Sequence, residues 1–236
     1  MKTFLKFLLP IALLSLLASC ATFDNTLVNK VSKAAVHSIL ISRQVDTSDF
    51  PLVALIVKEY AKDKMDLTPI LNKVQKDMYS VYAKHLPFAL LPESELLANE
   101  DYKTVLSTET SALTPWYIFP EGYAKTPLSK KNAAAMNKAF PNTNAYVGME
   151  ISYALKKQAS ISIFSRAGIR ATVLFTVINE KGEKILEKPI LAVSKTTIGV
   201  ILGGFNATPI QSMCTEATEN AMAEFDKWIL KELAKN

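Results

Sequence analysis

The sequence predicts an α+β domain of two layers, in which helices pack on a mixed sheet of about five strands. Three observations predict this class. Strand and helix patterns alternate through the first half of the chain. Three strand-like segments then follow one another within residues 144–197, and a long amphipathic helix pattern closes the chain. This order is typical of a domain that covers one sheet with helices.

The N-terminal segment has the pattern of a secretory signal peptide and not of a folded element. Lys2 and Lys6 supply positive charge, an apolar run from Phe7 to Leu17 follows, and small residues precede Cys20. This is the order of regions in a signal peptide. The apolar run is far shorter than the ~20 residues that a membrane-spanning helix needs.

The residues Leu17, Ala18, Ser19 and Cys20 resemble the lipobox of bacterial lipoproteins. The resemblance implies that a signal peptidase recognises Leu17, Ala18 and Ser19 and cleaves before Cys20. It also implies a diacylglyceryl group on the sulfur of Cys20 and an acyl group on its new amine. These chains would make the lipid bilayer a partner, because two or more anchoring signals give stable binding. The alternative is an ordinary signal peptide followed by a chance cysteine.

The residue after the lipidated cysteine bears on the choice of membrane. In enteric-type bacteria an aspartate there resembles an inner-membrane retention signal, and this chain has Ala21. The resemblance therefore implies an outer-membrane lipoprotein that faces the periplasm, with the inner membrane and the cell surface as alternatives. Residues 1–19 would be removed, residues 20–33 would form a lipidated tether, and residues 34–236 would form a single periplasmic domain. Fully extended, residues 21–33 reach at most ~45 Å.

Length, charge and cysteine content narrow the class of protein. Without residues 1–19, 217 of the 236 residues remain, and the net charge falls from +5 to +3 because Lys2 and Lys6 leave. That length suits one domain. The small charge, without a lysine or arginine cluster, gives no reason to expect a nucleic-acid partner. With Cys20 lipidated, Cys214 is the remaining thiol, and we expect a small buried hydrophobe there, with a reactive thiol as the alternative.

The first strand of the domain is expected at residues 34–44. Apolar residues occupy both of its faces, with Val36 and Leu40 on one and His37 on the other, which favours a central strand. His37 is expected to be packed and not to bind metal, because His85 is the chain's one other histidine.

Helical segments follow this strand. Residues 50–62 favour a helix, and Thr68 is the expected cap of the next one, which Pro87 ends. Residues 88–91 predict a short strand, and Pro92 begins another short helix. Residues 107–128 lack a clear period, and a helix over residues 129–140 comes after them.

Aromatic residues gather between Pro115 and Tyr123 in this region without a period. We expect them to fold back as a lid over the core. The alternative is a binding surface, which long loops often supply.

The clearest strand patterns lie in the last part of the chain. Residues 144–155 and 169–178 alternate apolar and polar side chains, and Asn179–Gly182 predicts a hairpin turn into a third strand over residues 185–197. Pro189 indicates that this third strand is an edge strand or contains a bulge.

The closing helix is expected from Pro209 to about Ala234. Thr208 and Gln211 have the spacing of a capping box around Pro209. The buried stripe of this helix is expected to consist of Ile210, Cys214, Ala217, Ala221, Phe225 and Trp228.

Two segments are candidates for interaction with a partner. One is the apolar, glycine-rich run of Gly199, Val200, Ile201, Leu202, Gly203, Gly204 and Phe205. We expect a strand end and a tight turn there, with an exposed docking loop as the alternative. The other is residues 156–168, either a mobile loop or a hairpin that overhangs the body, with Ile161, Ile163 and Phe164 near its tip.

Motifs for catalysis and metal binding are missing from the sequence. GxSxG, HExxH and CxxC do not occur, and histidine and cysteine do not cluster. We therefore expect a non-enzymatic protein with no catalytic residue, no bound metal and no cofactor apart from the covalent lipid.

The mature chain is similar in element order to several envelope lipoproteins. The features are the Leu86–Pro92 strand segment and the ending of a hairpin followed by a helix. They resemble uncharacterised envelope lipoproteins, the periplasmic domain of the curli-secretion lipoprotein and the lipoproteins that activate cell-wall synthases. The resemblance implies a protein-interaction or assembly module that binds an envelope protein or itself. The alternatives are a subunit of an oligomeric export channel and an envelope hydrolase or ligand carrier whose pocket lies under residues 115–123.

Overall fold

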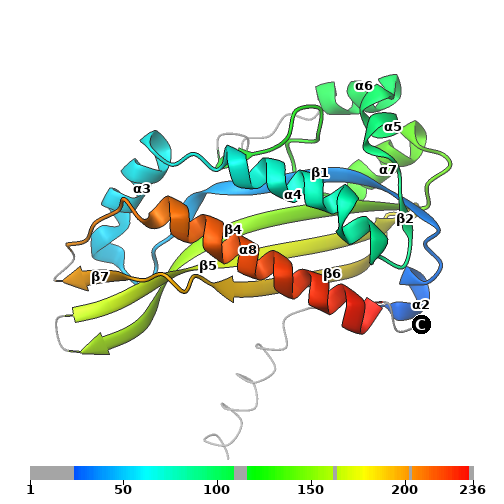
Figure 1. The fold of residues 1–236 in the computed structure, drawn as a ribbon. Helices are drawn as coiled ribbons and strands as arrows, with labels where there is room; N and C mark the ends of the chain where they lie inside the picture. Colours follow the sequence, from blue (N-terminus) through cyan, green and yellow to red (C-terminus); the bar gives the residue numbers. More distant parts are fainter. Residues whose placement is uncertain (1–23, 109–115, 162–163, 202–203, 234–236) are drawn as a thin grey trace, which may run out of the picture.

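The computed structural model consists of a strongly elongated mixed sheet and helices that pack on it (Figure 1). It describes residues 24–108, 116–161, 164–201 and 204–233. The strands of the main path lie in the order β2-β1-β4-β5-β6, with β3 beside β1 and β7 beside β5. The predicted α+β class is confirmed, and the lipobox residues lie outside the described residues.

The strands are β1 (Lys33–Asp46), β2 (Ala89–Leu90), β3 (Tyr117–Ile118), β4 (Ala145–Ile161), β5 (Phe164–Asn179), β6 (Lys184–Val193) and β7 (Ile198–Ile201). The helices are α2 (Asn25–Val28), α3 (Ala54–Asp63), α4 (Thr68–Ser80), α5 (Glu93–Ala98), α6 (Glu100–Thr108), α7 (Lys130–Ala139) and α8 (Ile210–Trp228). Among them, no helix is long and apolar enough to cross a membrane.

The hairpin of β4 and β5 is the longest feature of the sheet. Its antiparallel register runs from Ala145 opposite Asn179 to Ile161 opposite Phe164. The expected overhang is therefore present as a strand pair, with one irregularity between Lys157 and Ala159. β1 stops opposite Ala154, so β4 continues beyond it. On the other side β6 ends at Val193 and β7 takes over along β5.

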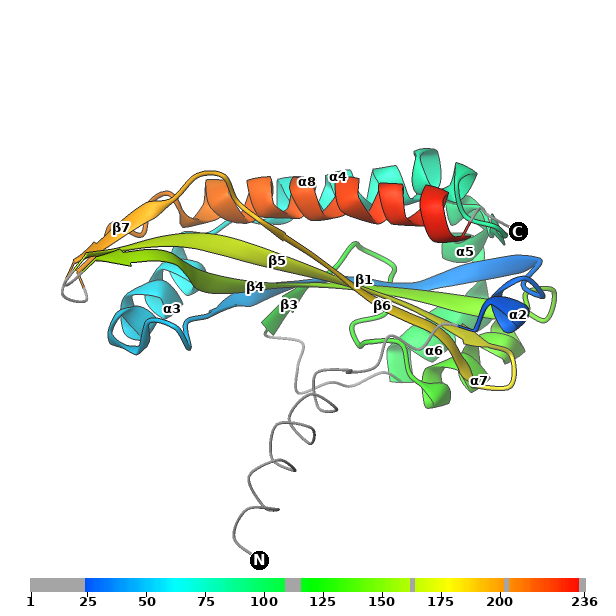
Figure 2. The same cartoon turned by 90° about the horizontal axis from the view of Figure 1, so that it is seen from below.

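Helix α8 and helix α4 cover one face of the sheet, and α3, α6 and α7 lie on the other (Figure 2). The expected stripe of α8 is buried, apart from Trp228, which is partly buried. Cys214 is fully buried and burial raises the pKa of its thiol, so it is the small hydrophobe that the sequence predicts. The hydroxyl groups of Tyr153 and Thr218 lie 2.8 Å apart and join β4 to α8.

Both predicted helix caps are wrong. Thr68 is the first residue of α4, and its amide donates to Asp66 Oδ1 at 2.9 Å. Pro209 precedes α8 without a side-chain cap. The Gln211 side chain accepts a hydrogen bond from the Asp66 amide at 3.0 Å and so joins α8 to the start of α4. The Gln211 side chain, expected to cap α8, therefore bonds to a residue distant in sequence and not to its own helix.

A bulge in β1 overturns the predicted faces of that strand. Val36 pairs with Val147, whereas Ser38 pairs with Gly148, so His37 is the extra residue. The residues that follow therefore change faces, and Val36 does not share one with Leu40. His37 is fully buried, as expected of a packed histidine. Its carbonyl accepts hydrogen bonds from the Tyr102 hydroxyl at 3.0 Å and the Ala124 amide at 3.2 Å.

The segment assigned to the tether is largely part of the domain. Val28 and Val31 are buried, and the amide of Asp24 donates to the carbonyl of Ile185 at 3.1 Å. Asn144 accepts hydrogen bonds from the amides of Ser32 and Lys33. Residues 24–33, which were expected to belong to the tether, are therefore packed on the domain, and residues 20–23 lie outside the described residues.

The edge strand β6 and the turn before it agree with the sequence prediction. Pro189 lies in β6, which is an edge strand, as the sequence predicts. Gly182 has φ +77°, the left-handed conformation that glycine adopts readily, and it closes the turn before β6.

The packing between α8 and β5 predicts the effect of Phe225→Ala. Phe225 is fully buried, and its ring centroid lies 4.9 Å from that of Phe175 and 5.4 Å from that of Tyr82. Its removal leaves a cavity, and we expect a loss of about 3–5 kcal/mol in the free energy of unfolding, measured by urea denaturation. Phe164→Ala is the matched control, because Phe164 is 54% exposed. Equal losses in the two variants would contradict this assignment of the core.

Candidate functional site

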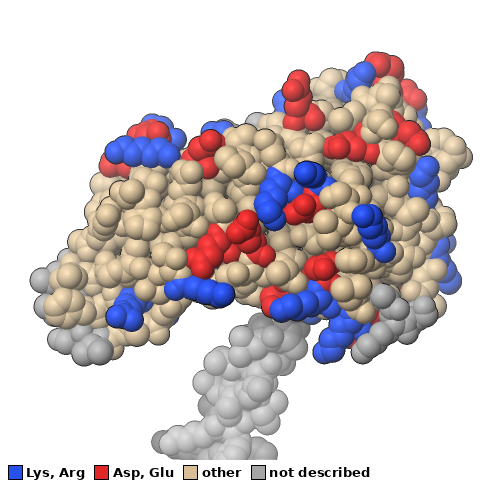
Figure 3. Space-filling model, viewed as in Figure 1, with Lys and Arg blue, Asp and Glu red and all other residues tan. Residues whose placement is uncertain are grey.

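The two segments proposed for interaction meet in one surface, which we call the distal tip. It consists of the ends of β4, β5 and β7, where Phe164 lies opposite Ile201 and Ser165 opposite Val200. Phe164 and Ile201 are 54% and 48% exposed. Ile163, Leu202 and Gly203 lie outside the described residues, as does the side chain of Ile161. This end of the face shown in Figure 3 is mostly uncharged, with a few basic side chains beside it.

The Gly199–Phe205 run is only partly the exposed apolar loop considered above. Val200 is buried and Phe205 is half-buried. Ile201 and Gly204 exchange two backbone hydrogen bonds of 3.0 and 2.8 Å, which make the expected tight turn. No atom lies within 4 Å of the position that a Cβ would take at Gly199. Among the described residues of this segment, Ile201 is therefore the exposed apolar side chain at the tip.

Helix α8 fixes the step from β6 to β7 that creates the tip. The carboxylate of Glu216 accepts hydrogen bonds from the amides of Lys195 at 2.9 Å and Thr196 at 3.0 Å. These hydrogen bonds, that from Thr196 above all, lower the pKa of Glu216. Ser194 accepts from the Ile169 amide at 3.1 Å and so holds the crossing on β5. The position of β7 is therefore set by the body of the domain.

A second candidate site is a groove of about 1000 Å³, which lies where β1 bends away from β4. The register of these strands shifts between Ile41 and Val45, and the intervening residues face the groove. One face of α3, the middle of β4 and β5, and Trp116 complete it. Its lining residues are Ser42, Arg43, Gln44, Val45, Asp46, Thr47, Ala54, Lys58, Ala61, Lys62, Trp116, Ser152, Tyr153, Ala154, Arg170 and Thr172.

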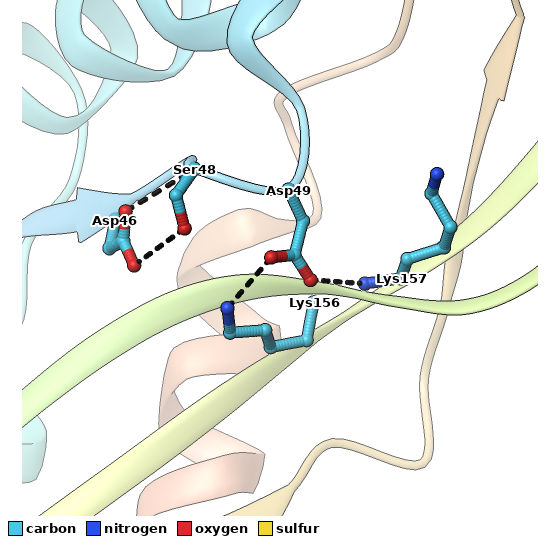
Figure 4. A network of polar contacts seen from close by, with 5 residues as sticks. All are labelled: Asp46, Ser48, Asp49, Lys156 and Lys157. Carbon is cyan, nitrogen blue, oxygen red and sulfur yellow. Dashed lines mark hydrogen bonds and ion pairs between the residues drawn. The ribbon is translucent and has the colours of Figure 1, made fainter. Parts of the chain in front are cut away.

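Positive charge dominates the lining of this groove. Arg43, Lys58, Lys62 and Arg170 face one carboxylate, that of Asp46. Asp46 already accepts hydrogen bonds from the amide and hydroxyl of Ser48, at 2.9 and 3.1 Å (Figure 4). The groove is therefore suited to an anion.

A polar network beside the groove ties the loop before α3 to β4 (Figure 4). The carboxylate of Asp49 accepts hydrogen bonds from Lys156 Nζ at 2.8 Å and from the amide of Lys157 at 3.3 Å. The hydrogen bond from Lys156 is the largest of several causes that lower the pKa of Asp49, and the charge of Arg170 also contributes. These contacts connect α3 to the hairpin.

The aromatic segment before α7 divides between the core and the groove. Trp116 is 41% exposed and lines the groove, so its ring is available to a ligand. Tyr123 is buried, and its hydroxyl donates to Glu93 Oε1 at 2.6 Å and lies 2.9 Å from that of Tyr79. Tyr123 therefore folds over the core, as the lid hypothesis predicts. The ligand-carrier hypothesis required a cleft with polar groups at Trp116 or Tyr123, and one is present at Trp116.

Sequence reasoning missed the cationic residues of the groove. They come from β1, α3 and β5 and lie far apart in the chain, so no local motif joins them. The one local signal is the spacing of Ala54, Lys58 and Lys62, which places these residues on one helix face. Among the described residues, histidine, cysteine, aspartate and glutamate form no cluster that could hold a metal ion.

The solved structures that match the chain include two of low similarity. No family model matches the chain, and no curated protein matches it. The hypothetical protein CT253 from Chlamydia trachomatis has 12% identity to this chain and a TM-score of 0.31. The match covers 84% of this chain and 97% of the CT253 chain. Lipoprotein GNA1162 from Neisseria meningitidis has 10% identity to this chain and a TM-score of 0.28. The match covers 82% of this chain and 99% of the GNA1162 chain. At these TM-scores neither likeness transfers a site or an activity.

The buried phenols predict a loss of stability at alkaline pH. Burial raises the pKa of Tyr82 from 10.0 to about 12, and burial also raises that of Tyr79 and Tyr123. The unfolded chain loses these protons first, so the free energy of unfolding falls as pH rises through this range, and the contribution is complete below pH 10.0. Urea denaturation across the range measures the fall. Tyr82→Phe keeps the ring and should lessen the fall; an unchanged pH dependence would contradict the assignment.

Proposed function

We propose that this protein is a lipid-anchored, non-enzymatic envelope lipoprotein that docks a protein partner at its distal tip. The observation that carries the proposal is the pairing of Phe164 with Ile201, two large apolar side chains that are both about half exposed. A pair of this kind at the end of three strands combines apolar area with open backbone groups, which are the two means by which strand edges bind partners.

The tip lies at the opposite end of the sheet from the segment that leads to the anchor. α2 packs beside Ile185, whose neighbour Leu186 pairs with Val177. From Val177 to Phe164, β5 extends for about 43 Å at the usual rise per residue. Residues 21–23 span at most ~11 Å. With a lipid on Cys20, the domain would lie close to the bilayer at its α2 end.

This geometry favours a protein as the occupant of the tip. A bilayer that holds Cys20 next to α2 is far from Phe164 when the long axis of the sheet points away from it (Figure 1). An envelope protein on the far side of the domain, or bound alongside it, can reach the tip. We place the protein in the outer membrane facing the periplasm because Ala21 takes the position of the retention residue.

The groove favours a second candidate function, that of a ligand carrier. A concave site that combines cations, hydroxyl groups and an exposed indole ring is typical of small-molecule binding. The two functions are compatible because the groove and the distal tip share no lining residue.

The anchor is tested by Cys20→Ala, which removes the sulfur that would carry the lipid. We expect the variant to leave the outer-membrane fraction and to keep its signal peptide, whereas the parent chain sediments with the outer membrane. Fractionation followed by mass spectrometry of the N-terminus measures both. Ser15→Ala, a change within the apolar run that leaves residues 17–20 intact, is the control. Retention of the Cys20→Ala variant in the membrane with cleavage at the same bond would contradict the proposal.

The tip is tested by photocross-linking in cells, with a photoreactive phenylalanine in place of Phe164. We expect one or a few discrete products with other envelope proteins, and Ile201→Ser should reduce them severalfold because it removes the neighbouring apolar surface. A probe at Leu191 is the matched control, since Leu191 is 50% exposed on the edge strand β6.

Three outcomes of the cross-linking experiment would contradict the docking of a partner at the tip. These are equal products from positions 164 and 191, no product from position 164, and products with the protein's own copies alone. Ring-shaped particles after detergent extraction, together with products between copies, would instead support the export-channel alternative.

A further inference from the structure

We propose that the groove between β1, α3 and β5 binds a small organic anion, with its phosphate or carboxylate group at Arg170 and its body against Trp116. The site is independent of the distal tip and of the lipid anchor. Its size and its lining argue for a molecule of the dimensions of an acidic sugar or a sugar phosphate.

Arg170 is the strongest single indication of an anion. Its place on β5 lies between Ala154 on β4 and Val193 on β6, and neither neighbour offers a side-chain acceptor. Its Nε is buried and makes no hydrogen bond within the part of the chain that the structure describes. A buried donor without an acceptor is unfavourable. Carboxylate and phosphate oxygens are the acceptors that match a guanidinium best.

The nearest acidic groups do not neutralise the groove. Asp49, whose pKa the charge of Arg170 helps to lower, gives its oxygens to Lys156 and the Lys157 amide. Among the described residues, Arg43 and Lys58 form no salt bridge within 4.0 Å, while Lys62 lies 3.9 Å from Asp63 in an exposed pair. Exposed pairs of this kind are weak. The groove therefore keeps a net positive charge.

The space favours an organic molecule over a bare ion. Ala54, Ala61 and Ala154 line the groove, and their small side chains leave room between α3 and the sheet. The volume of about 1000 Å³ is at the upper end of the range for small-molecule sites and far exceeds the size of phosphate.

The rest of the lining suits the body of such a ligand. The half-exposed indole of Trp116 offers a flat face to a ring. The side chains of Thr47, Ser152 and Thr172 supply hydroxyl groups to the same space. Together with Arg170, these side chains would recognise a ligand that carries a ring, hydroxyl groups and an anionic group.

The test uses the fluorescence of Trp116. The chain has two tryptophans, so Trp228→Phe leaves Trp116 as the reporter. This variant is titrated at constant ionic strength with glucose 6-phosphate, glucuronate and uncharged glucose, each to millimolar concentrations. We expect saturable changes with one or both acids and none with glucose. Binding of one acid alone supports the proposal and identifies the anionic group.

The role of Arg170 is tested by Arg170→Gln in the same background. We expect the affinity for the acid to fall about tenfold or more, because charge-assisted hydrogen bonds are lost. Arg166→Gln is the matched control, since Arg166 is an exposed arginine on the same strand that does not line the groove. Lys58→Gln, on the surface of α3, gives a second reading if Arg170→Gln fails to fold, and it should also weaken binding.

Several results would overturn the inference. They are the absence of a response to both acids, an equal response to glucose, and an equal loss of affinity in Arg166→Gln and Arg170→Gln. None of these results bears on cross-linking from position 164, so the failure of one proposal leaves the other intact.

Discussion

The continuous pairing of β4 with β5 is the constraint on which the rest of the structure depends. Its register runs through 16 residue pairs with one irregularity, between Lys157 and Ala159. One face of the hairpin packs on α8, where Phe175 meets Phe225 and Tyr153 meets Thr218. Because a strand pair this long is covered by α8 over only part of its length, its far end emerges from the core.

Both candidate sites arise where the neighbours of this hairpin end. β1 shifts its register after Ile41 and stops opposite Ala154, and the bend leaves the space that becomes the groove. β6 stops at Val193, and β7 continues along β5 to place Ile201 beside Phe164. The polar contacts of Asp49 and Glu216 then hold α3 and the β6–β7 connection in these positions. A single long hairpin with shorter partners thus explains the groove and the tip together.

The regions on which the proposals rest are separated along one axis of the domain. α2 lies at one end of the sheet and the distal tip at the other (Figures 1 and 2). The groove lies between them, where β1 bends away from β4. Most residues of the central strands β1, β4 and β5 between the two ends are buried. Ligand in the groove would contact β1, α3 and β5, of which β5 also builds the tip.

The sequence by itself determined the elements whose signal is local. The period-2 alternation of residues 144–155 and 169–178, the proline in the edge strand and the stripe of α8 were all confirmed, because each depends on near neighbours in the chain. The tertiary structure decided the rest. An extra residue such as His37 has no sequence signal, since a bulge is defined by the partner strand. Gln211 caps no helix because Asp66 is brought to it, and the groove gathers Arg43, Lys58 and Arg170 only through strand order and the bend of β1. Contacts between residues distant in sequence depend on sheet topology, which a pattern of near neighbours does not contain.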